Sequence, residues 1–134
     1  LRNACAHNNC ILNEMSAGKP MFCARNAVSR AVGGIRTIGK GQRKSKLSND
    51  RLQQVATTLY VHSILASDGV HQHRPESLHA FVSRMNKHIE YYEGNDQISS
   101  GFEFIEKLVD AWFSPDAMVA DLEKKTLDSG RPKE

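Results

Sequence analysis

Several features common in other protein classes are missing from this chain of 134 residues. It has no apolar run near the roughly 20 residues that cross a bilayer, and its N-terminus lacks the basic, apolar and small-residue succession of a signal peptide. Cysteine is scarce, with only Cys5, Cys10 and Cys23. Because this number is odd and all three lie in apolar or helical contexts, reduced core thiols are favoured over a disulfide framework. We therefore expect a cytoplasmic protein with no membrane segment.

Strand signals are also weak, whereas apolar residues recur at helical spacing between clear breaks. With 40% hydrophobic and 25% charged residues, the chain has the composition of one folded domain. The pattern predicts an all-α helical bundle of five to six helices. The expected helices cover residues 1–15, 22–32, 49–66, 75–93 and 100–113, with a shorter one from 114.

Within this domain, 1–127, we expect a motif helix at 1–16, a basic Gly-rich loop at 33–47 and the helical bundle at 48–127. Residues 128–134 are expected to form a flexible tail. Ser48 or Asn49 can cap the helix that follows, and the order Ser100 to Glu103 is typical of a capping box. Gly94 suits the end of the 75–93 helix.

Acidic residues are absent between Glu14 and Asp50, and this gap coincides with the Gly-rich segment. A cluster of cations beside glycines can follow a polyanion, because neutralising phosphates releases counterions. The alternative is a solvated, mobile surface loop. The predicted RNA-binding residues are Arg36, Lys40, Arg43, Lys44 and Lys46.

A separate set of chemical groups stands at the start of the chain, where Arg2, Asn3 and His7 fall within two helical turns. RNA cleavage without a metal requires proton transfer at two oxygens and stabilisation of charge on the phosphate. Imidazole exchanges protons near neutral pH, and guanidinium matches phosphate oxygens. Asn3 and His7 are four residues apart and nearly aligned on a helix. Arg2 lies on another side of that helix, so its long side chain must extend around the helix to reach His7. One such segment offers one histidine, so a two-fold dimer would bring two together.

The stretch from Leu1 to Asn13, LRNACAHNNCILN, resembles the HEPN signature, and is more closely similar to the form found in Abi-like (abortive infection) proteins. The resemblance implies a helical, dimeric, metal-independent endoribonuclease with antiphage or toxin roles. Arg2 would stabilise the phosphate, Asn3 would help to orient the imidazole, and His7 would transfer protons. Helices expected before the motif are absent, so we expect the chain to be the C-terminal part of a larger HEPN/Abi-like protein. Its partners would be RNA, a second copy, and an antitoxin or phage-derived trigger, with no cofactor.

A second interpretation is a non-catalytic module that dimerises or binds RNA through its basic segment. In that case Arg2 and Asn3 cap or pair locally, and His7 is structural. His71, His73 and His79 have a spacing that could suit zinc, but no further ligand completes the set, and an exposed polar loop is the preferred interpretation. No metal site is therefore predicted.

Overall fold

The structure is a computed structural model that describes residues 24–65 and 74–114, and every regular element in these two ranges is helical. The all-α prediction is therefore confirmed. The elements are α2 (Asn26–Gly33), α3 (Lys40–Leu47), α4 (Asp50–Leu65), α6 (Arg74–Asn86), the 3-10 helix η2 (Ile89–Tyr92) and α7 (Asp96–Phe113). The predicted motif helix, the helix from 114 and the tail lie outside the described residues.

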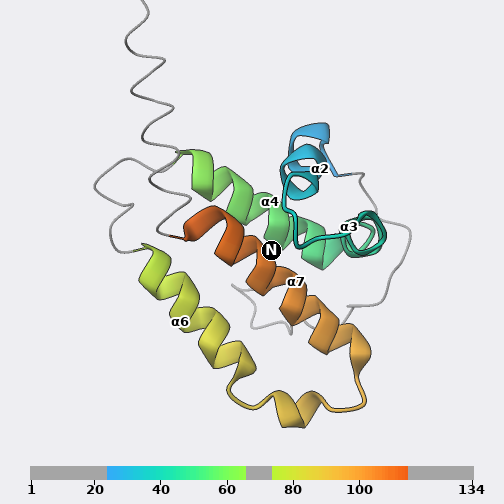
Figure 1. The fold of residues 1–134 in the computed structure, drawn as a ribbon, viewed down its shortest axis with the longest axis vertical. Coiled ribbons are helices and arrows are strands. Elements are labelled where there is room, and N and C mark those ends of the chain that lie inside the picture. The colour runs from blue at the N-terminus through green and yellow to red at the C-terminus, as the bar shows by residue number, and fades with distance from the viewer. Residues whose placement is uncertain (1–23, 66–73, 115–134) are drawn as a thin grey trace, which may run out of the picture.

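Helix α7 is the centre of the bundle, with α4 along one side and α6 along the other (Figure 1). The α6 helix runs antiparallel to α7: Asn86, at its end, donates to Glu106 across 3.3 Å, while His79, nearer its start, lies 3.6 Å from Asp110. The α4 helix runs in the same direction as α7. Helices α2 and α3 pack on α4 at the opposite side from α6 (Figure 1).

The apolar face of α7 forms the heart of the core. Phe104, Leu108 and Val109 are completely buried. Phe104 and Leu108 are four residues apart, as are the buried Ile105 and Val109, which is the spacing that repeats one face of a helix. They meet Val32 from α2 and Ala56 from α4, both with no exposed surface. The core thus joins helices far apart in sequence, which fixes where α2 stands relative to α7.

Two helix boundaries differ from the prediction because the chain reverses direction between α6 and α7. The helix expected to reach residue 93 ends at Asn86, and the chain then turns through η2 and Gly94, whose φ of +86° favours glycine. Tyr92 packs edge-on against Phe102 of α7, with ring centroids 5.3 Å apart. An α6 continued to residue 93 would not turn the chain back towards α7.

The start of α7 was also predicted wrongly. Asn95 caps the helix, and its side chain accepts a hydrogen bond from the Ile98 amide at 3.3 Å. Ser100 lies inside the first turns, where its hydroxyl donates to the Asp96 carbonyl. The expected capping box is therefore not a cap. By contrast, the predicted cap at Asn49 is confirmed, since its Oδ1 accepts from the Arg51 and Leu52 amides, each at 3.0 Å.

The largest correction concerns residues 33–47, which are not a loop throughout. Residues from Lys40 to Leu47 form the helix α3, which begins after the extended Gly39. Arg, Lys, Gln and Leu are good helix formers, so the segment's composition is compatible with a helix despite its glycines. Ile35, Ile38 and Leu47 are each less than a tenth exposed and anchor the segment in the core. These apolar contacts outweigh the glycines and the charge.

Candidate nucleic-acid interface

The candidate site in the described part of the chain is a basic surface formed by α2, α3 and the residues beside them. Residues 25–51 contain one acid, Asp50, among eight lysines and arginines. Five of these cations are exposed and define what we call the basic surface: Arg25, Arg30, Arg36, Lys40 and Lys44. Arg2, Asn3 and His7 lie outside the described residues.

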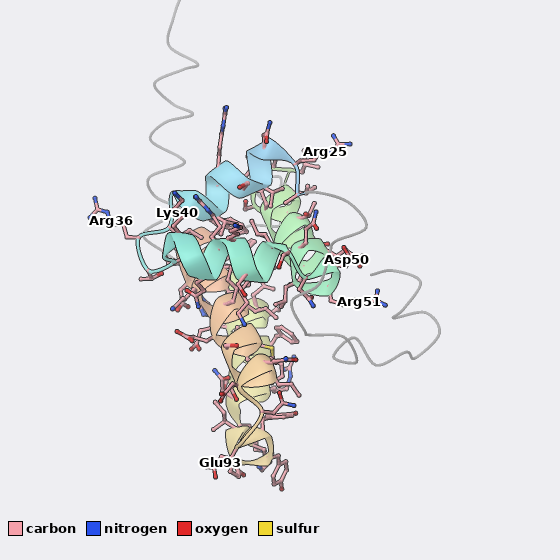
Figure 2. All side chains as sticks on the ribbon, turned by 90° about the vertical axis from the view of Figure 1, so that its right-hand side faces the viewer. Arg25, Arg36, Lys40, Asp50, Arg51 and Glu93 are labelled. Atoms are coloured by element: carbon pink, nitrogen blue, oxygen red, sulfur yellow. The ribbon has the colours of Figure 1, made fainter. Side chains whose placement is uncertain are left out.

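The basic surface occupies one end of the described helices. Figure 2 shows Arg25, Arg36 and Lys40 around α2 and α3, while Glu93 lies at the opposite tip, beyond α6 and η2. Glu90, in η2 three residues before Glu93, is also exposed. The uneven charge that is visible in the sequence therefore becomes a separation in space. A polyanion would be attracted to one end and repelled from the other.

The structure brings three of the five predicted RNA-binding residues to the surface. Arg36 lies in the connection between α2 and α3, and its side chain extends into solvent (Figure 2). Lys40 opens α3, and Lys44 follows it four residues later, so both lie on the same face of that helix. Both lysines are exposed. This trio forms the part of the prediction that the geometry favours.

Arg43 has a different environment, because its guanidinium lies directly over α2. A Cβ atom added to Gly33 would fall 1.9 Å from Nη1 of Arg43 and 3.1 Å from Cζ. The arginine is half-buried and covers the glycine at the end of α2. Glycine at position 33 therefore allows the charge to pack close to the backbone. Arg43 contributes positive charge near the surface while also joining α3 to α2.

Lys46 points away from the basic surface, towards α7. Its Nζ donates to the Ser100 hydroxyl at 2.5 Å. Partial burial lowers the pKa of Lys46 below its ordinary value, and the carboxylate of Glu103 opposes this shift. The side chain lines a small hollow with Asn49 and Gln97. Of the five predicted RNA-binding residues, this one is withdrawn from phosphate contact.

Arg25 and Arg30 were missing from the predicted RNA-binding set, although both are exposed members of the basic surface. Both stand in the same acid-free stretch, so the charge pattern could have included them. The predicted set covers the Gly-rich segment alone, and both arginines precede that segment. The structure adds them because α2 packs against α3.

Within residues 24–65 and 74–114, no three His, Cys, Asp or Glu side chains come together as metal ligands would. No helix in these ranges has the length and apolar character needed to cross a membrane. His79, from the histidine group considered above, contacts Asp110, while His71 and His73 lie outside the described residues.

Comparison with known proteins identifies no relative: no family model, no curated protein and no solved structure matches this chain.

Proposed function

We propose that this chain is a metal-independent endoribonuclease domain of an abortive-infection, antiphage or toxin-type protein. In this proposal the basic surface holds the RNA backbone, and Arg2, Asn3 and His7 carry the chemistry. The observation that supports RNA as the ligand is the grouping of five exposed cations at one end of the described helices. The support for cleavage is the resemblance of residues 1–13 to the HEPN signature of Abi-like proteins.

The proposed reaction starts from the RNA itself. The 2′-oxygen loses its proton and attacks the adjacent phosphorus, while the bond from phosphorus to the 5′-oxygen breaks and that oxygen gains a proton. The products are a 2′,3′-cyclic phosphate and a 5′-hydroxyl end. His7 would transfer a proton, Arg2 would stabilise the phosphate charge and Asn3 would orient the imidazole. A second copy of the chain would supply the second imidazole.

The proposal includes a cytoplasmic setting, a homodimer, and an antitoxin or phage-derived trigger as the regulating partner. The homodimer and the regulating partner follow from the resemblance of residues 1–13 to Abi-like proteins. The separation of the basic surface from the tip around Glu93 also indicates where a partner would bind. An acidic partner or RNA would approach at α2 and α3, and not at the tip around Glu93.

Cleavage of a labelled single-stranded RNA in EDTA tests the proposal directly in the full-length protein. We expect cleavage to survive chelation and to be lost in His7→Ala and in Arg2→Ala. His88→Ala is the matched control, because this exposed histidine lies near the acidic tip. Cleavage that is unaffected by either substitution, or that requires a divalent metal, would contradict the assigned chemistry.

A second candidate function is a non-catalytic RNA-binding or dimerisation module. The basic surface favours it, because phosphate binding by exposed cations needs no reacting groups. RNA binding that weakens with salt, together with no cleavage in any condition, would establish this candidate instead.

A further inference from the structure

An open groove runs beside the basic surface, between the end of α2 and the last turns of α7. Its volume is about 690 Å³, and its lining includes Gly34, Arg36, Thr37, Lys107, Asp110 and Trp112. Because Arg36 belongs to both, the groove continues the basic surface defined above. We call it the Trp112 groove.

Trp112 gives this groove an aromatic wall. The indole is half-buried and packs against Tyr60 of α4, with ring centroids 5.7 Å apart and an angle of 54° between the rings. This contact holds the indole in place, and Trp112 is also one of the residues that line the groove. A fixed aromatic face beside cations is the arrangement on which a nucleic-acid base stacks, because every base has a π-face.

The charges around the groove give a bound nucleotide a direction. Lys107 is already paired with Glu103 at 2.6 Å and contacts Gln42 at 3.4 Å, so its charge is largely compensated. Arg36 extends from the rim into solvent (Figure 2) and can reach a phosphate. The Asp110 carboxylate, more than half exposed, would repel phosphate from its side. The phosphate therefore belongs at Arg36, and the base belongs along Trp112.

We propose that the Trp112 groove binds one nucleotide of a single-stranded RNA, with the base stacked on Trp112 and its phosphate held by Arg36. This inference rests on the proposed function, since it takes RNA as the ligand of the basic surface. It adds that the RNA must present an unpaired base. Double-stranded RNA, whose bases are already stacked, would use the cations but not the groove.

Trp112 is itself the probe, because it is the only tryptophan in the chain. Unlabelled single-stranded RNA is titrated while Trp112 emission is recorded, and binding is followed in parallel by the anisotropy of a labelled copy. We expect saturable quenching with the same midpoint as binding. An oligomer with the same ribose-phosphate backbone but no bases should bind without quenching.

The outcomes separate the two proposals. If RNA binds and Trp112 emission does not change, the groove proposal is overturned, while RNA binding by the basic surface stands. If no RNA binds even at low salt, both proposals fail. A base-free backbone that quenches as strongly as RNA also overturns stacking at Trp112.

Substitutions at the same position distinguish stacking from packing. Trp112→Phe keeps an aromatic face and should retain nearly all RNA affinity, whereas Trp112→Leu keeps only apolar bulk and should bind about tenfold more weakly. Equal RNA affinity of the folded Trp112→Phe and Trp112→Leu variants would contradict the proposal.

If both Trp112 variants fail to fold, Arg36→Ala, a substitution of an exposed residue, is compared with Arg25→Ala. Only Arg36→Ala should reduce the quenching at saturation, and equal quenching in both would overturn the assignment.

Discussion

Lys46 of α3 donates a hydrogen bond to Ser100 of α7, a residue 54 positions later in the chain, with Nζ and Oγ 2.5 Å apart. Lys44 stands two residues before it on the same helix and is exposed. Two residues correspond to about 200° of rotation around a helix, so the two lysines face opposite ways. One lysine therefore helps to attach α3 to the bundle, and the other remains available to an anion.

This difference predicts distinct effects of two matched substitutions on RNA binding. Lys44→Gln should weaken binding and reduce the slope of log affinity against log salt by about 1, because one phosphate contact is lost. Lys46→Gln should leave that slope unchanged and should lower the free energy of unfolding by about 1 kcal/mol, the usual contribution of one hydrogen bond. Binding titrations over a range of salt, with urea unfolding, measure both. A reduced slope in Lys46→Gln would show that this lysine reaches RNA.

The two asparagine caps should differ in their contribution to stability. Asn49 is 4% exposed and accepts from two amides at 3.0 Å, whereas Asn95 is exposed and accepts from the Ile98 amide at 3.3 Å. We expect Asn49→Ala to lower the free energy of unfolding by about 1–2 kcal/mol. Asn95→Ala should lower it by about 0.5 kcal/mol, at the low end for helix caps. Urea unfolding of the two variants provides the measurement. A larger loss for Asn95→Ala would contradict this ranking.

Two phenylalanines on neighbouring helices test the position of the core. Phe104 of α7 has no exposed surface, while Phe81 of α6 is 42% exposed. Phe104→Ala should cost about 3–5 kcal/mol, because it removes a buried ring and leaves a cavity. Phe81→Ala should cost less than about 1 kcal/mol. Thermal and urea unfolding check the pair, and comparable losses would mean that the face of α6 carrying Phe81 is covered.

The pKa of Glu90 is lowered from its ordinary value by its histidine neighbour. Nδ1 of His88 lies 3.0 Å from its Oε1, and this hydrogen bond is the chief reason that the pKa of Glu90 falls below its ordinary 4.5. Because the folded-state pKa is the lower one, the contact stabilises the fold above pH 4.5, and this contribution is lost as pH falls through the folded-state value.

The measurement for Glu90 is an NMR titration of its side-chain carboxyl. His88→Leu should return its pKa towards 4.5, whereas Lys87→Gln, a neighbouring change that retains the histidine, should leave it low. An unchanged titration in His88→Leu would show that the histidine is not the cause.

Part of the fold could be predicted from local pattern alone. The spacing predicts that α7 turns Phe102, Ile105, Leu108, Val109 and Trp112 inward, and the first four are buried. Phe104, which that pattern leaves out, has no exposed surface, whereas Trp112 is only half-buried. The cap at Asn49 is likewise local, since its side chain bonds to amides two and three residues away. The end of α6 is not local, because it depends on the turn that brings Tyr92 to Phe102.

The sequence by itself determined the helical class, most of the inner face of α7 and the gathering of positive charge before α4. It also supplied the residues Arg2, Asn3 and His7 on which the proposed chemistry rests. Only the tertiary structure decided that residues 40–47 form a helix anchored by Leu47, that Lys46 turns inward, and that Trp112 borders Arg36. The physical reason is distance along the chain. Periodicity reports neighbours within a few turns, whereas the partners of these residues lie on helices that only packing brings together.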